Sequence, residues 1–218
     1  MALAGLDYQS TYKTSRFEVP TNRKIPRDVI EIRRRTIERL VKRKDWKTIL
    51  QFYDEGHFDE GLSWISPSIA MIDFIAEALR QFGLTKISSI GCGGGLLEWM
   101  ITTIAGIEIS GYEVDEPWWT SEYSPPRFIK TNFVVNELPA IPEDHAIMFC
   151  YFNSEKIFEK YIGAYEGPCL IIIGPAGIPG RYSEPEPLQL QDHPDWKLDS
   201  WHNIRDDDDV VAIYKRRN

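Results

Sequence analysis

The amino-acid sequence predicts an α/β fold with a mostly parallel sheet, and three features carry this prediction. A short apolar run, a glycine-rich turn and an amphipathic run follow one another over residues 87–100, as in a strand, a turn and a helix. Further apolar runs then alternate with a helical pattern, which is typical of parallel strand–helix units. The length of 218 residues suits one such domain with a helical extension.

The N-terminal part is predicted to be helical rather than part of the sheet. Residues 1–25 are polar and show no sustained periodicity, so we expect a partly ordered arm there. A helix is predicted to begin at Pro26 or Arg27, and Asp45 is a suitable N-cap for a second, short helix. These two helices make residues 26–62 a basic helical cap.

The main domain is predicted to span residues 63–218. Ser66 and Pro67 are suited to begin its first helix, which leads into a strand at residues 86–90. The elements expected after the glycine turn are helices at residues 96–103 and 154–165, and strands at residues 107–114, 127–131, 145–152, 169–173, 196–202 and 210–216. The last two strands are expected to form an antiparallel pair, with the four-aspartate run of residues 206–209 as a solvated turn between them.

Composition excludes several classes of protein. The chain has no run of about 18 apolar residues, so no membrane-spanning helix is predicted. Its N-terminus lacks the basic and apolar regions of a secretory signal, and we expect a cytoplasmic location, with a nuclear one as the alternative. The three cysteines form no C-x-x-C pair, which argues against a disulfide framework and against a zinc site, and no metal site is expected.

Charge is distributed unevenly along the chain. Residues 22–47 contain 11 Lys or Arg against 4 Asp or Glu, although the whole chain has a net charge of −8. The segment is therefore a basic attachment on an acidic body. It could bind RNA or another acidic partner. It could also be a solvated helix whose charges complement the domain it packs on, which is the more usual reason for a charge run.

The spacing of the glycine turn restricts the ligand. The turn reads G-C-G-G-G from Gly91, and it lacks the lysine of a phosphate-binding P-loop. A dinucleotide fingerprint would need a third glycine where Leu96 or Glu98 stands. What the sequence does have is G-x-G-x-G followed, about twenty residues later, by Glu113 at the end of the second predicted strand.

This combination resembles the first motif of the class I S-adenosylmethionine-dependent methyltransferases. The wording S-I-G-C-G-G-G-L-L-E, the G-Y-E-V around Glu113 and the later I-I-I-G-P-A-G also resemble an uncharacterised methyltransferase-like subgroup. The superfamily resemblance covers about residues 63–217. It implies a Rossmann-like seven-stranded sheet in the order 3-2-1-4-5-7-6, with strand seven antiparallel, and S-adenosylmethionine as the cofactor.

The same resemblance implies a set of cofactor-binding residues. The methionine part of the cofactor would lie against the glycine turn, an acid would accept the ribose hydroxyls, and a polar residue after strand three would contact the adenine. Trp64 is added because its loop is expected to cross the pocket. The expected cofactor-binding residues are thus Gly91, Cys92, Gly93, Gly95, Glu113, Asn132 and Trp64. Relatives often carry an acid where this chain has Ser89, so a charge-assisted contact to the cofactor's ammonium group is expected to be lost.

The catalytic residues are less clearly marked. Tyr151 and Asn153 follow the fourth predicted strand and are expected to be the polar groups nearest the methyl. No N-P-P-Y motif stands there, which disfavours methylation of nucleobase amino groups. A packing or surface role is the more usual one for single histidines such as His57 and His145. Glu98 is expected either to face the ligand or to cap its helix.

Two functions follow from these patterns. The first is a methyltransferase with an unidentified acceptor, in which the acceptor attacks the sulfonium methyl in line. The alternative is a catalytically inactive methyltransferase-like module that binds a protein or RNA. Ser89 and the missing catalytic motif favour the alternative, whereas the glycine turn and Glu113 favour the first.

Overall fold

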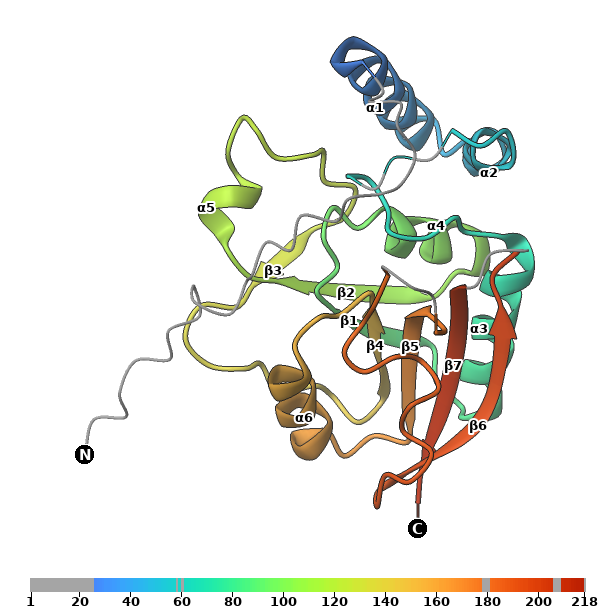
Figure 1. Ribbon diagram of the computed structural model, residues 1–218, viewed down its shortest axis with the longest axis vertical. Helices are drawn as coiled ribbons and strands as arrows, with labels where there is room; N and C mark the ends of the chain where they lie inside the picture. The colour runs from blue at the N-terminus through green and yellow to red at the C-terminus, as the bar shows by residue number, and fades with distance from the viewer. Residues whose placement is uncertain (1–25, 58, 60, 178–180, 206–208, 218) are drawn as a thin grey trace.

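The computed structural model describes residues 26–217, except for 58, 60, 178–180 and 206–208 (Figure 1). The predicted N-terminal arm lies outside the described residues. The helices are α1 (Arg27–Lys42), α2 (Trp46–Asp54), α3 (Ile69–Gln81), α4 (Leu96–Ala105), α5 (Glu116–Trp119) and α6 (Glu155–Ala164). The strands are β1 (Lys86–Ile90), β2 (Glu108–Glu113), β3 (Thr131–Phe133), β4 (His145–Cys150), β5 (Cys169–Pro175), β6 (Trp196–Asn203) and β7 (Asp209–Arg216).

The described strands form one sheet in the order β3-β2-β1-β4-β5-β7-β6. The pairs from β3 to β5 are parallel, whereas β7 runs antiparallel to both of its neighbours. The predicted fold class is therefore confirmed, including the position and direction of the antiparallel strand. Because the order reverses at β1, the chain leaves β1 toward β2 on one side and returns to β4 on the other.

Both faces of the central strands are buried, as the uninterrupted apolar sequence of β4 predicts. Ala146 and Met148 point into a core shared with α3 and α4. Ile147 and Phe149 point into a second core shared with α6. Figure 1 shows α6 on one side of the sheet and α3 and α4 on the other. This two-sided burial holds the carboxyl ends of the central strands, where the candidate site lies, in a fixed register.

The two N-terminal helices pack on the α3–α4 side. Ile37 of α1 and Ile49, Leu50 and Tyr53 of α2 belong to the same apolar core as that face of the sheet. Asp45 caps α2 as predicted, because its carboxylate accepts the Thr48 amide. The helices thus share a core with the sheet, and the division into an arm, a cap and a main domain stays a prediction.

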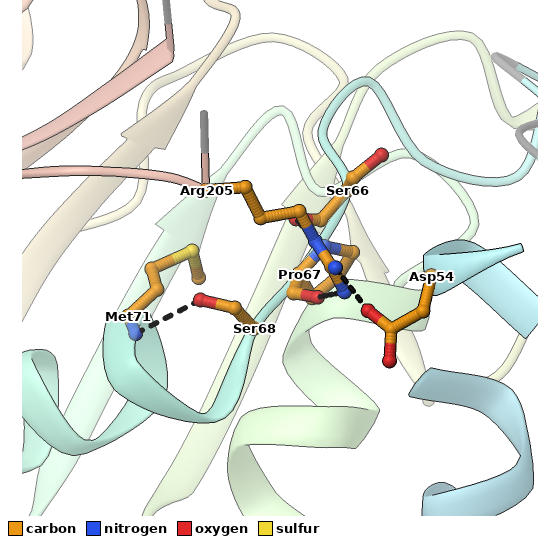
Figure 2. A network of polar contacts seen from close by, with 6 residues as sticks. All are labelled: Asp54, Ser66, Pro67, Ser68, Met71 and Arg205. Atoms are coloured by element: carbon orange, nitrogen blue, oxygen red, sulfur yellow. Dashed lines mark hydrogen bonds and ion pairs between the residues drawn. The ribbon is translucent and has the colours of Figure 1, made fainter. Parts of the chain in front are cut away.

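Helix α3 begins later than the sequence predicts. Its N-cap is Ser68, whose hydroxyl accepts the Met71 amide, rather than Ser66. Figure 2 shows the polar contacts of this segment: the guanidinium of Arg205 reaches Asp54 and the carbonyls of Ser66 and Pro67. The two carbonyls accept these hydrogen bonds over distances of 3.1 and 2.6 Å. This long-range contact holds the segment before α3 as an extended loop.

Two other elements differ from the prediction. Strand β3 covers Thr131–Phe133 instead of residues 127–131, and the short helix α5 was not expected. Within α5 Pro117 stands in the first turn, and Asp115 caps it by accepting the Trp118 amide. Among the described residues, no helix is long and apolar enough to cross a membrane.

Candidate functional site

A cavity of about 680 Å³ lies at the carboxyl ends of β1, β2 and β4. The glycine turn lines the cavity, together with residues that directly follow β2 and β4. Further residues come from α1, the loop before α3 and α5; the lining includes Arg34, Ser63, Trp64, Gly91, Cys92, Gly93, Gly94, Glu98, Glu113, Asp115, Trp118, Trp119, Cys150, Tyr151, Phe152 and Asn153. Segments far apart in the sequence thus meet at the point where the strand order reverses.

The glycine turn has the backbone conformation that its sequence predicts. Gly91, Gly93 and Gly95 have φ angles of +74°, +56° and +76°. Residues other than glycine adopt this left-handed backbone region only at an energetic cost. The amides of Gly91 and Cys92 donate to the carbonyl of Tyr112 over 2.9 and 3.1 Å, which fastens the turn to β2. The turn therefore presents backbone rather than side chains to the cavity at Gly91 and Gly93.

Glu113 ends β2 and lies against this turn. Its two carboxylate oxygens accept the amides of Gly93 and Val114, each over 2.9 Å, and the residue is 9% exposed. Burial raises the pKa of the Glu113 carboxyl above its usual value, and the two amide donors act in the opposite direction. A carboxylate has about four acceptor positions, so Glu113 can still accept hydroxyl groups from a ligand.

Glu98 is a second carboxylate among the lining residues, and Glu98 and Glu113 together are called the carboxylate wall. It is the third residue of α4, and one of its oxygens accepts the Ser89 hydroxyl over 2.7 Å. Burial raises the pKa of Glu98 to about 7, although the Ser89 hydrogen bond opposes this shift. Glu98 does not form a capping box, because the Gly95 amide already donates to the Cys92 carbonyl.

Trp64 and Tyr151 form an aromatic part of the lining, called the aromatic wall. The rings of Trp64 and Tyr151 stack with their centroids 5.8 Å apart, and the loop of Trp64 lines the cavity as predicted. The Tyr151 hydroxyl donates to Asp209 over 2.6 Å, and burial followed by this contact raises the pKa of Tyr151 far above its usual value. The Tyr151 hydroxyl is thus bonded within the protein, and the catalytic role expected for Tyr151 stays a prediction. Asp209 is 1% exposed, so this last residue of the four-aspartate run is not solvated as predicted, whereas residues 206–208 lie outside the described residues.

Most of the residues expected in the site line the cavity: Trp64, Gly91, Cys92, Gly93, Glu113, Tyr151 and Asn153. Gly95 and Asn132 are not among the lining residues. Gly95 is the N-cap of α4, and a Cβ there would overlap the side chain of Ile129. Asn132 is exposed and donates its side-chain amide to the Gly111 carbonyl over 3.1 Å. The cofactor-binding and catalytic roles of all nine residues stay predictions.

The histidines that the sequence singles out lie elsewhere. His145 is buried at the start of β4, where its Nδ1 atom lies 2.9 Å from the Ser88 hydroxyl oxygen. His57 packs its ring against Phe52, with 4.6 Å between ring centroids. Neither histidine is among the residues that line the cavity.

Sequence reasoning missed the contribution of α1 to the cavity. Arg34 lines it and forms an ion pair with Asp59 at 3.0 Å, and Asp59 also accepts the Gly61 amide. Residues 25 apart in the sequence give no periodic signal of this contact. Arg34 is therefore paired within residues 26–62, whereas Arg39 and Lys42 are exposed. Both interpretations of the charge run, charges that complement the domain or an RNA or acidic partner, stay predictions.

No family model and no curated protein matches the chain. Solved structures do match it. One match is the magnesium protoporphyrin IX methyltransferase ChlM from Synechocystis PCC 6803 with bound S-adenosylmethionine. It is 12% identical, covers 68% of this chain and 79% of its own, and has a TM-score of 0.41. Another is a putative caffeoyl-CoA O-methyltransferase from Staphylococcus aureus, at 12% identity, 84% and 99% coverage and a TM-score of 0.45.

A third match is the 16S rRNA methylase ArmA, at 13% identity, 79% and 98% coverage and a TM-score of 0.42. These similarities are low, and the fold is established by the strand order of the chain itself, with its antiparallel β7 between β5 and β6. The chain has the class I methyltransferase fold. Within this fold the cavity lies beside the topological switch point, where open α/β sheets bind their ligands.

Proposed function

We propose that the protein is an S-adenosylmethionine-dependent methyltransferase with an unidentified acceptor. The main support is the meeting of the G-x-G-x-G turn and Glu113 in one cavity at the switch point of a class I methyltransferase fold. The volume of about 680 Å³ is within the range of small-molecule sites. The cavity thus suits a nucleoside cofactor together with part of an acceptor.

The residues present fit this cofactor. Gly91 and Gly93 present backbone without side chains among the lining residues, and the Glu113 carboxylate beside them can accept hydroxyl groups from a ligand. Trp64 and Tyr151 offer aromatic faces for a planar group. When bound, S-adenosylmethionine supplies an electrophilic methyl group, which passes to a lone pair of the acceptor while the carbon–sulfur bond breaks.

The part of the protein in this reaction would be chiefly positioning. The cavity walls would hold the acceptor's nucleophilic atom in line with the methyl group and keep bulk water away, and such positioning can supply much of the rate. None of the imidazoles that the structure describes belongs to a lining residue, and the Tyr151 hydroxyl is bonded to Asp209. With neither kind of group placed to take up a proton, we expect an acceptor atom that has a free lone pair at neutral pH.

Calorimetry with S-adenosylmethionine and S-adenosylhomocysteine tests the proposal. Glu113→Ala removes two charge-assisted acceptors and is expected to weaken binding of both ligands about 100-fold or more. The matched control is Glu108→Ala, an exposed position on the same strand, which is expected to bind like the wild type. Absence of binding to the wild type at millimolar ligand would remove the proposal, and unchanged binding to Glu113→Ala would remove the site assignment.

Turnover is a separate question from binding. Incubation with a methyl donor carrying a labelled methyl group, in the presence of fractionated small molecules, RNA and proteins, is expected to label one class of acceptor. Binding of the cofactor without any labelling would instead support the alternative of a catalytically inactive module.

A further inference from the structure

The carboxylate of Glu98 is incompletely satisfied by the protein. Its side chain is 1% exposed, and one oxygen accepts the Ser89 hydroxyl over 2.7 Å. The other oxygen, Oε2, is fully buried and has no hydrogen-bond partner among the residues that the structure describes. A buried carboxylate oxygen without a donor is costly, and such a group calls for an explanation. Since Glu98 lines the cavity, a ligand can supply the missing donor.

The charges of the groups around Glu98 favour a positively charged hydrogen-bond donor. Ser89 is neutral, and burial raises the pKa of the Cys92 and Cys150 thiols, so these stay neutral as well. Glu113 lies near enough to oppose ionisation of Glu98 and is itself acidic. Arg34, the basic residue of the lining, is paired with Asp59. The wall therefore attracts a cationic N–H group and repels an anion.

The position of Glu98 indicates which end of an extended ligand it meets. Glu113 ends β2 and is hydrogen-bonded to the turn on the β2 side. Glu98 is hydrogen-bonded to β1 through Ser89, and its charge also acts on Cys150 at the end of β4. The two carboxylates thus reach the cavity from different elements, Glu113 from the end of β2 and Glu98 from the first turn of α4. A ligand with hydroxyls at one end and an ammonium group at the other would meet both.

We propose that Glu98, held in place by Ser89, binds the ammonium group of the aminoacyl end of the ligand. This inference rests on the proposed function, because that cofactor carries an α-amino group distant from its ribose hydroxyls. Glu98 would then supply, from the first turn of α4, the negative charge that position 89 lacks. The first turn of a helix also suits an ionised carboxylate, because the helix dipole stabilises a negative charge there.

Binding of three related ligands tests this assignment by calorimetry at pH 7.5. S-Adenosylhomocysteine has both the nucleoside and the ammonium group, its 2-oxo analogue lacks only the ammonium group, and 5′-methylthioadenosine lacks the whole aminoacyl end. The wild type is expected to bind S-adenosylhomocysteine about 10- to 100-fold more tightly than the 2-oxo analogue. Glu98→Gln keeps the size and an acceptor for Ser89 but places a neutral amide at the ligand.

In Glu98→Gln, affinity for S-adenosylhomocysteine is expected to fall by about the same 10- to 100-fold, with unchanged affinity for the other two ligands. Ser89→Ala, which frees the carboxylate to move, should produce a smaller loss confined to the same ligand. The exposed Glu108→Gln serves as the control for loss of one negative charge.

Equal losses for all three ligands in Glu98→Gln would overturn the proposal in favour of a purely structural role, and unchanged affinity for S-adenosylhomocysteine would also overturn it. Failure of the proposed function looks different, because the wild type would then bind neither S-adenosylhomocysteine nor 5′-methylthioadenosine. Thermal unfolding of each variant shows that the comparison is made between folded proteins.

Discussion

The two walls of the cavity differ in how completely the protein satisfies its own polar groups. On the aromatic wall, the Tyr151 hydroxyl donates to Asp209 and the ring stacks on Trp64. On the carboxylate wall, Glu113 accepts two backbone amides, whereas Glu98 keeps one buried oxygen without a donor among the described residues. The aromatic wall is complete without a ligand, and the carboxylate wall is not.

The two walls should therefore contribute to ligand binding in different ways. A wall whose polar groups are already bonded offers a ligand mainly apolar contact area. A wall with an unsatisfied buried carboxylate contributes more to the binding free energy, because a ligand that donates to the carboxylate removes the free-energy cost of the missing hydrogen bond. Neutralising Glu98 should therefore raise stability and lower affinity, whereas removing the Tyr151 hydroxyl should lower stability and leave affinity nearly unchanged. The following predictions test this contrast, beginning with the largest effect.

The largest effect is expected for the stability of Glu98→Gln. Since the pKa of Glu98 is raised from 4.5 to about 7, the folded state binds more protons than the unfolded state between these values. The wild type should therefore lose stability as pH rises through this interval, and the loss should be complete above about pH 7. Glu98→Gln removes this titration, so at pH 8 it should be about 3 kcal/mol more stable than the wild type.

Urea unfolding at pH 5 and pH 8 measures this effect. Besides burial, the groups that act on Glu98 are Ser89, its own backbone amide and Glu113, and all of them are unchanged in the variant. Glu108→Gln should keep the pH dependence of the wild type, because this residue is exposed. If Glu98→Gln lost stability with pH as steeply as the wild type, Glu98 would not be the buried group responsible.

On the aromatic wall, Tyr151→Phe should reduce stability and leave ligand affinity nearly unchanged. The variant removes the 2.6 Å hydrogen bond to the buried Asp209, at an expected cost of about 1–2 kcal/mol in the free energy of unfolding. Affinity for S-adenosylhomocysteine and any methyl transfer should stay within about threefold of the wild type, because the ring remains.

The matched control is Tyr123→Phe, which lines the same cavity but is 75% exposed and should have no effect on stability. Unfolding curves and calorimetry of both variants provide the measurement. A loss of methyl transfer by orders of magnitude in Tyr151→Phe, at unchanged ligand affinity, would mean that its hydroxyl acts in the reaction and would contradict the contrast between the walls.

The smallest effect is expected for Trp64→Ala. The indole is 49% exposed and stacks on Tyr151, so its loss should weaken nucleoside binding by about 1 kcal/mol, or roughly fivefold, with little change in stability. Trp64→Phe should restore most of the affinity. Trp201→Ala removes an indole of the same exposure, 50%, from β6 and should leave calorimetric binding unchanged. Equal weakening in both variants would show that Trp64 has no specific contact with the ligand.

The sequence by itself determined the sheet and its ligand-binding turn. Apolar runs, the glycines with positive φ and Glu113 at the end of β2 are local signals, because backbone conformation and strand burial depend on nearby residues. The late start of α3 was not visible in this way, since Arg205 lies 138 positions after Pro67. The same holds for Asp209, whose burial depends on Tyr151 from another strand end.

Only the tertiary structure decided how the polar groups of the site are distributed. It brought Glu98 against Ser89, paired Arg34 with Asp59, turned the Tyr151 hydroxyl toward Asp209 and left Gly95 and Asn132 outside the cavity lining. Each of these outcomes depends on a contact between segments that fold onto one another. A sequence pattern can predict which residue types lie at the ends of strands. The burial of these residues and the hydrogen bonds of their polar atoms depend on how the whole chain packs.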